Sequence, residues 1–162
     1  MSEKKERRIL VAVDEGEESM HALSWCLNNL VHPNSDDTLI LLYCKAPRPV
    51  YTALDGAGGY LFSADVSAAM ERYSDQVADS VMEKAKKLCA NAQQQQVKVE
   101  TRVENGDARD AICEAAEKLG ADVLVMGSHG YGVIKRAFLG SVSNHCAQKA
   151  KCPVLIVKKP KS

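Results

Sequence analysis

A segment rich in glycine, serine and basic residues, 127–143, carries the residue types best suited to hold an anion. Gly127 and Gly130 lack a Cβ atom, so the backbone there can approach a ligand closely. Gly140 precedes a predicted helix, and the first backbone amides of a helix have no acceptor within it. The helix dipole contributes about 0.3–1 kcal/mol to holding an anion, and each hydrogen bond to a charged phosphate about 1.5–3 kcal/mol. The segment therefore predicts a phosphate site.

The other residues of this segment add donors to the predicted phosphate site. They are Ser141, Val142, Ser143, Lys135 and Arg136. The serines offer amides and hydroxyls, and the basic pair is placed to reach the outer phosphates. The alternative is that the three glycines are turn residues and that an ordinary helix begins after the last of them. A lone glycine pattern is weak evidence, but its position between a predicted strand and a predicted helix favours phosphate binding.

Asp14 follows an apolar run and is a second candidate ligand residue. A carboxylate in this position can accept hydrogen bonds from ribose hydroxyls, and it can equally cap the turn into the next helix. The glycine-rich segment favours the ribose interpretation. His129 lies between two glycines of that segment, and we interpret it as a surface histidine rather than a catalytic one.

Five short runs predict the strands that must position these residues. Four of them, 9–13, 39–43, 123–126 and 154–157, are nearly continuous in apolar residues. Such runs are typical of strands covered on both faces in a parallel sheet. In 97–103, valine and threonine instead alternate with charged residues, which predicts a strand at the sheet edge with one wetter face.

Helical spacing separates these runs. Apolar residues recur every three or four positions over 20–30 and 66–88. Asp107 can cap a third helix, and a fourth would run from about Ser141 to Lys149. Alternation of strands and helices predicts a doubly wound α/β sheet with right-handed crossovers. Ligands of such sheets bind beyond the carboxyl ends of the strands, where Asp14 and the 127–143 segment would meet.

Length and composition limit the class of protein. The chain has 162 residues, 46% of them hydrophobic and 26% charged, which is typical of a single globular domain. Its 21 basic residues balance its 21 acidic residues, so no net field attracts nucleic acid, and no apolar run is long enough for a membrane helix. We expect no nucleic-acid partner, no stable membrane association and a cytoplasmic location, with the nucleus as the alternative. Because the charged segment 1–8 has no apolar centre, it does not resemble a signal peptide.

Six cysteines, at 26, 44, 89, 113, 146 and 152, form no C-x-x-C pair. No histidine pair has metal-ligand spacing either, so we expect no metal site. Several of the cysteines fall inside apolar patterns, where cysteine behaves as a small hydrophobic residue. We expect reduced, mostly buried thiols rather than a disulfide framework.

Five separated patches resemble one known family in order and spacing. The central one is Gly127-x2-Gly130-x9-Gly140-Ser141, and the others are Val11-Ala-Val-Asp14, Ser19-x-x-Ala22, Gly106-Asp107-Ala108 and Cys152-Pro153-Val154. Together they resemble the ATP-binding type of the universal stress protein family, in a form similar to its small single-domain plant members. The likeness covers about residues 7–159 of an expected single domain, 1–162, and it breaks mainly in 46–65.

The resemblance implies a Rossmann-like, five-stranded parallel sheet with strand order 3-2-1-4-5 and helices on both faces. It implies bound ATP or AMP, with Mg²⁺ as an accompanying ion. The nucleotide-binding residues that it implies are Val13, Asp14, Cys44, Met126, Gly127, Gly130, Gly140, Ser141, Val142 and Ser143. The chemistry of the segment adds the basic pair Lys135 and Arg136 to this set. It further implies a homodimer, often formed through the last strand, and a signalling protein partner such as a kinase. In one departure, Gly16 replaces the serine common in the family, which affects the cap of the first helix.

The function expected from these residues is a nucleotide-binding regulatory module of the stress response. An enzyme that hydrolyses ATP slowly at the same site is the alternative. It ranks lower because the sequence has no Walker-type phosphate loop and no general base placed to activate water. A phospho-acceptor receiver domain fits less well, because Glu104-Asn105-Gly106 offers no aspartate at the end of the third predicted strand.

Overall fold

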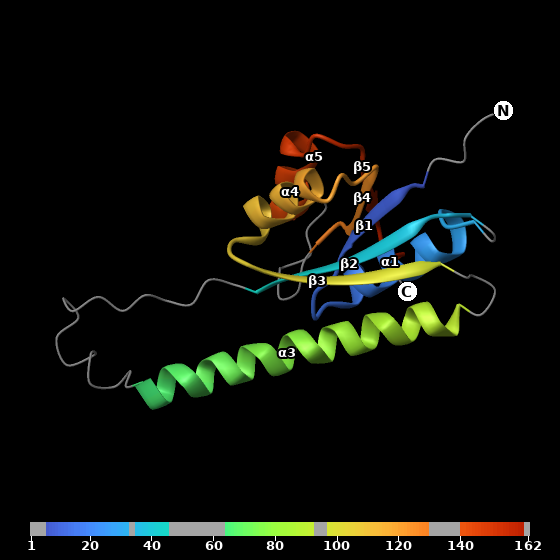
Figure 1. The fold of residues 1–162 in the computed structure, drawn as a ribbon. Coiled ribbons are helices and arrows are strands. Elements are labelled where there is room, and N and C mark those ends of the chain that lie inside the picture. Colours follow the sequence, from blue (N-terminus) through green and yellow to red (C-terminus); the bar gives the residue numbers. More distant parts are fainter. Residues whose placement is uncertain (1–5, 33–34, 46–63, 93–96, 130–139, 161–162) are drawn as a thin grey trace.

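Five parallel strands form the sheet of this protein, which a computed structural model describes over residues 6–32, 35–45, 64–92, 97–129 and 140–160 (Figure 1). The strands are β1 (Arg8–Ala12), β2 (Thr38–Lys45), β3 (Lys98–Asn105), β4 (Val123–Gly127) and β5 (Val154–Val157). Their order is β3-β2-β1-β4-β5, with every neighbouring pair parallel, which confirms the predicted fold class and strand order.

The helices cover both faces of the sheet, as a doubly wound fold requires. They are α1 (Glu17–Asn29), α3 (Ala64–Asn91), α4 (Ala108–Lys118) and α5 (Ser141–Lys149). One core lies between the sheet and α1 with α3, and it includes Ile9, Leu23 and Leu41. The other lies between the opposite face and α4 with α5, and it includes Leu10 and Leu124. Figure 1 shows α4 and α5 on one side of the sheet and α3 on the other.

Local chemistry explains where two helices begin and end. The Asp107 side chain accepts a hydrogen bond from the Arg109 backbone amide at 2.9 Å, so it caps α4 as predicted. Gly106, just before this cap, has φ of 130°, a conformation that a side chain disfavours. At the end of α5 the chain is already extended at Ala150, and Pro153 then leads into β5.

An ion pair joins the segments that precede β1 and β2. The Arg7 guanidinium donates from Nε to Asp37 Oδ1 at 3.0 Å and from Nη2 to Asp37 Oδ2 at 2.7 Å. It also donates to the carbonyl oxygen of Leu30, just after α1, at 2.9 Å. The side chain of Asp37 is 3% exposed, and the hydrogen bond from Arg7 holds the pKa of this carboxyl below its usual value. The segments that precede β1 and β2 are therefore joined by an ion pair in which Asp37 is buried and Arg7 is partly exposed.

β3 is an edge strand, as its alternating sequence predicts, but its apolar face is exposed as well as its charged face. Val99 is 36% exposed and Val103 is 45% exposed, although both lie on the apolar face. α3 also extends its apolar stripe beyond the core, because Tyr73 near its beginning is 69% exposed while Ala85 is fully buried. The prediction of a buried apolar stripe therefore holds only for the second half of α3.

Candidate functional site

A cavity lies at the carboxyl ends of the inner strands, where the strand order reverses. It encloses about 90 Å³. Its lining consists of Ala12, Val13, Asp14, Ser19, Leu42, Cys44, Ala108, Ile112, Met126, Gly127, His129, Val142 and Ser143. In open α/β sheets this crevice is the usual place for a ligand. Seven of the residues that the sequence singled out as nucleotide ligands thus border one space.

Asp14 shapes the turn from β1 into α1. Its Oδ1 accepts from the Gly16 backbone amide at 2.8 Å and from the Ser19 hydroxyl at 3.0 Å. Ser19 Oγ in turn accepts from the Asp14 backbone amide at 2.9 Å. Gly16 is the N-cap of α1 and has no side chain to cap it, so Ser19 supplies the hydroxyl that organises this turn. The turn function proposed for Asp14 is therefore present in the structure.

Glu18 connects α1 to the chain that follows β4. It is 7% exposed, and its Oε2 accepts from the Ser128 hydroxyl at 2.9 Å and from the His129 backbone amide at 2.8 Å. His129 Nδ1 lies 3.5 Å from the same oxygen and 3.1 Å from Ser128 Oγ. Glu18 lies in the first turn of α1, where the helix dipole favours a negative charge. A buried carboxylate thus holds two consecutive residues at the rim of the cavity.

Gly127 ends β4 against the backbone of α1. A Cβ atom at this position would lie 3.0 Å from the Glu18 carbonyl carbon and 3.1 Å from its oxygen. These contacts are tighter than nine in ten real Cβ contacts, so a side chain here would require the backbone of α1 to move by a few tenths of an ångström. The close packing of α1 is therefore one structural reason for glycine at 127, and Gly127 also lines the cavity where the sequence suggested the approach of a ligand.

The beginning of α5 closes the other side of the cavity. The Gly140 amide and the Ser143 hydroxyl both donate to the Ser128 carbonyl oxygen at 2.7 Å. The first hydrogen bond within α5 runs from the Asn144 amide to the Gly140 carbonyl at 2.9 Å, so the amides of 141–143 precede the helical hydrogen-bond ladder. The Ser143 hydroxyl has a protein acceptor, which leaves its backbone amide as the donor of interest.

Most of the predicted ligand residues lie at or beside the cavity. Val13, Asp14, Cys44, Met126, Gly127, Val142 and Ser143 line the cavity, and Gly140 and Ser141 stand beside it at the start of α5. Gly130, Lys135 and Arg136 lie outside the described residues. Sequence reasoning missed Glu18 as a member of the site. The only available signal was an acid in the first turn of a predicted helix, which does not reveal a contact with residues 110 and 111 positions away.

The thiols near this site are kept neutral by burial. Burial raises the pKa of Cys44, which lines the cavity, to about 11, and Glu104 adds to this shift. Burial also raises the pKa of Cys146 to about 12, with a further contribution from Cys113, whose sulfur lies 3.8 Å away. All six cysteines are free in the structure, two of them buried and the others half-buried.

The described part of the chain contains neither a membrane-spanning helix nor a metal-binding cluster. Within it, no helix is both long enough and apolar enough to cross a membrane. The same residues contain no cluster of three or more histidine, cysteine, aspartate or glutamate side chains arranged to hold a metal ion.

Comparison with known proteins gives a consistent result. The family model described as "Universal stress protein family" matches residues 6–158. A universal stress protein of Methanocaldococcus jannaschii is 30% identical over 155 residues, which cover 96% of this chain and 84% of the relative. Universal stress protein PHOS32 of Arabidopsis thaliana is 29% identical over 168 residues. This match spans 95% of the chain but only 65% of the length of PHOS32. The match to the related PHOS34 from the same plant spans only 62% of the length of that protein.

Solved structures agree in fold. The protein MJ0577 superposes with a TM-score of 0.73 at 24% identity, covering 96% of this chain and 98% of the other. A universal stress family protein from Arabidopsis thaliana with AMP bound gives 0.65 at 22% identity, covering 95% and 92%. A universal stress protein in complex with cAMP gives 0.62 at 23% identity, covering 93% and 95%. From the family model and the 30% identical relative, the chain belongs to the universal stress protein family.

Proposed function

We propose that this protein binds an adenine nucleotide, ATP or AMP, in the cavity at the carboxyl ends of β1, β2 and β4, and acts as a regulatory module of the stress response. The observation that carries the proposal is the convergence of the expected ligand residues on this one cavity. The AMP and cAMP found in two structural neighbours support an adenine nucleotide as the ligand class.

The described residues suggest how the nucleotide would be oriented. Val13 and the backbone at Cys44 would contact adenine, and the Asp14 carboxylate would accept from ribose hydroxyls. The cavity volume of about 90 Å³ is well below the roughly 300–1,000 Å³ of typical small-molecule sites, so a whole nucleotide extends beyond it. The phosphates would then lie at the amides that begin α5, where the helix dipole favours negative charge. Any Mg²⁺ would accompany these phosphates.

The proposal includes protein partners. A homodimer would form through β5, the sheet edge opposite β3, whose sequence Val154-Leu-Ile-Val157 is apolar and half-buried over its first three residues. A signalling protein such as a kinase would be the partner that responds to the bound nucleotide. Neither partner is required for the nucleotide-binding part of the proposal.

Calorimetry with AMP, ATP and cAMP tests the site directly. Ala108 is the first residue of α4, half-buried, and lines the cavity, so Ala108→Trp should fill the space proposed for the nucleotide. We expect this variant to lose at least about tenfold in affinity, equivalent to roughly 1.4 kcal/mol.

The matched control is Glu114→Trp, which adds the same side chain to an exposed position of α4 that lines a different groove. This control should bind as the wild type does, and both variants should keep the wild-type circular dichroism spectrum. A wild-type protein that binds none of the three nucleotides, or an Ala108→Trp variant with unchanged affinity, would show that the site is wrongly assigned.

A further inference from the structure

Within the described part of the chain, the edge strand β3 presents a long border of the sheet with no strand beyond it. β3 pairs with β2 on one side, and no other strand of the described chain lies beyond it. Seven of its eight residues are exposed, and Glu100 is half-buried. An open edge strand of this length can pair with a strand of another chain unless it is protected. The side chains of β3 determine whether such pairing is opposed or favoured.

The backbone of β3 alternates between the partner strand and the open edge. The Gly106 amide, directly after β3, donates to the Lys45 carbonyl of β2 at 2.9 Å. The register with β2 is continuous from Lys98 to Asn105, so even-numbered residues direct their backbone groups toward β2. The odd-numbered residues Val99, Thr101 and Val103 then direct N–H and C=O groups outward. These are the groups that an added strand would use.

The side chains of β3 are complementary to themselves when the strand is reversed. In an antiparallel pair centred on Thr101, Lys98 stands opposite Glu104 of the partner subunit, and Glu100 stands opposite Arg102 of the partner subunit. Val99 stands opposite Val103 of the partner subunit. Directly opposed unlike charges and β-branched pairs both stabilise antiparallel strands. This register also places outward-directed backbone groups opposite each other, as hydrogen-bonded pairs require.

The neighbouring registers are unfavourable. A shift of two residues in one direction opposes Glu100 to its own copy and Lys98 to Arg102. The same shift in the other direction opposes Arg102 to its own copy and Glu100 to Glu104. Like charges directly opposite each other are destabilising. The charge sequence of β3 therefore disfavours the two adjacent registers that keep the backbone groups aligned. Registers shifted by four residues oppose only one kind of unlike pair, Lys98 with Glu100 or Arg102 with Glu104, so the register about Thr101 brings the most residues of β3 into favourable pairs.

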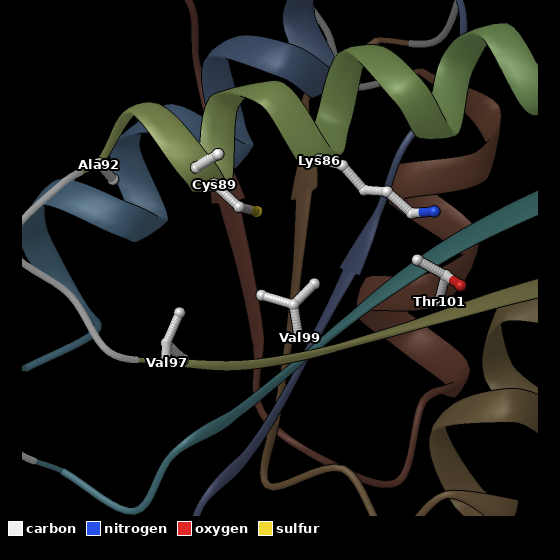
Figure 2. Close-up of a pocket in the computed structure, with 7 residues that line it drawn as sticks. Lys86, Cys89, Ala92, Val97, Val99 and Thr101 are labelled. Carbon is white, nitrogen blue, oxygen red and sulfur yellow. The ribbon is translucent and has the colours of Figure 1, made fainter.

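The surroundings of β3 leave room for a second strand. An open groove of about 540 Å³ separates β3 from the last turns of α3. Figure 2 shows Val99 and Thr101 of β3 and Cys89 and Lys86 of α3 on opposite sides of this groove. Since the valines of an added antiparallel strand point to the same face as Val99, they would cover apolar surface that is now exposed.

From these observations we propose that the β3 edge is a self-recognition surface, on which a second copy of this chain pairs antiparallel about Thr101 to join two five-stranded sheets. The partner is a second copy because the charge order Lys98, Glu100, Arg102, Glu104 is complementary in sign to its own reverse. Glu100 already lies 3.7 Å from Arg8 of β1, and it would then stand between two arginines. The inference does not rest on nucleotide binding, which concerns the carboxyl ends of the strands.

Charge exchange tests this surface by sedimentation at several protein concentrations. Lys98→Glu opposes two glutamates across the axis and Glu104→Lys opposes two lysines, so each variant alone should associate about tenfold more weakly than the wild type. A mixture of the two variants should restore association, because each glutamate then meets a lysine. The double variant Lys98→Glu/Glu104→Lys should associate with itself as the wild type does. Lys149→Glu makes the same charge change on α5, away from β3, and should have no effect.

A cysteine pair provides a second, geometric measurement. Thr101→Cys would place two thiols opposite each other at a Cα separation of about 5.5 Å, within the range of a disulfide. Mild oxidation with copper phenanthroline should then give a covalent dimer, whereas Lys98→Cys, displaced from the axis, should not. A wild-type monomer at all concentrations overturns the proposal, as does an assembly whose mass is the same in Lys98→Glu and in the wild type. Equal crosslinking of the two cysteine variants also overturns it.

Discussion

Glu18 is the side chain through which α1 positions the chain that follows β4. Its carboxylate accepts from the Ser128 hydroxyl and from the His129 amide, in a setting that is 7% exposed. In a sequence, an acidic run after the first strand suggests repulsion of phosphate. In the structure, Glu18 instead meets donors from its own chain. The role of this residue depends on a contact between distant segments, which residue spacing does not encode.

Replacement of Glu18 by alanine should lower both stability and nucleotide affinity. The variant leaves the Ser128 hydroxyl and the His129 amide without their carboxylate, and hydrogen bonds to charged groups contribute about 1.5–3 kcal/mol each. We expect the free energy of unfolding, measured with urea, to fall by about 2–3 kcal/mol. Affinity for the nucleotide should fall severalfold, because the rim of the cavity loses its attachment to α1.

Glu17 is the matched control for this change. It is the preceding residue of α1, its side chain is 75% exposed, and it pairs with Lys159 at 2.5 Å. Exposed pairs of this kind contribute about 0–1 kcal/mol, so Glu17→Ala should change stability little. Glu18→Gln retains an oxygen acceptor and should fall between the two. Equal unfolding energies for Glu17→Ala and Glu18→Ala would refute the role assigned to Glu18.

At the scale of elements, most helices and strands were predictable from local patterns. Branched apolar runs located β1, β2, β4 and β5, and alternation with charged residues located β3 at the edge. Capping chemistry located the start of α4 at Asp107. Local patterns could not predict how far each strand is covered. Val99 of β3 is exposed where α3 leaves an open groove beside this edge, and Val103 is exposed further along the strand. The burial of a strand face depends on how the neighbouring helices pack against it, which the spacing of apolar residues along the strand does not encode.

The cap of α4 should be sensitive to acid. Hydrogen bonds from the side chain and the backbone amide of Arg109 lower the pKa of Asp107 to about 2. Because this pKa is lower than that of the unfolded chain, about 3.9, the Asp107 carboxylate stabilises the folded state at pH values above about 3.9. This contribution is lost as the pH falls through about 2. We expect amide exchange in the first turn of α4 to accelerate over this range in the wild type.

Two variants of Asp107 separate its charge from its capping function. Asp107→Ala should show fast exchange in the first turn of α4 already at neutral pH, because the Arg109 amide loses its acceptor. Asp107→Asn should retain most protection, since asparagine is also a good N-cap, but should lose the acid dependence. Slow exchange in the alanine variant at neutral pH would contradict this account.

At the scale of the whole molecule, the sheet concentrates its ion pair at one end and its cavity at the other. Arg7 and Asp37 precede β1 and β2, while Asp14 and Gly127 lie at or beyond the carboxyl ends of β1 and β4. The strand order implied by the family resemblance is confirmed, and a cavity lies where a doubly wound sheet of this order is expected to bind its ligand. The ion pair was not predicted, because Arg7 and Asp37 are 30 positions apart and each is unremarkable in composition.

Removal of the Arg7 cation should destabilise the whole domain. In Arg7→Met, Asp37 stays buried without its guanidinium partner, which costs about 1–3 kcal/mol of unfolding free energy near neutral pH. This loss of unfolding free energy is smaller than the loss from breaking a fully buried ion pair, because the Arg7 side chain is 38% exposed. Urea unfolding at pH 7 measures this loss.

The same variant should also change the acid sensitivity of the fold. The lowered pKa of Asp37 means that its stabilising effect is present above about 3.9 and is lost as the pH falls through its folded value. Arg7→Met should therefore lose less stability than the wild type between pH 5 and the acid range. The double variant Arg7→Met/Asp37→Asn should recover part of the neutral-pH loss. An unchanged pH profile in Arg7→Met would show that Asp37 is not held by Arg7.

The separation of the Arg7–Asp37 pair from the cavity has a consequence for adaptation. Substitutions that adjust stability at the amino ends of the strands need not disturb the proposed nucleotide site at their carboxyl ends, because the length of the parallel strands separates the two. Lineages living at different temperatures would then be free to vary the residues before β1 and β2 while retaining one ligand preference. The thermal stability of this domain and the selectivity of the proposed site can thus change independently in evolution.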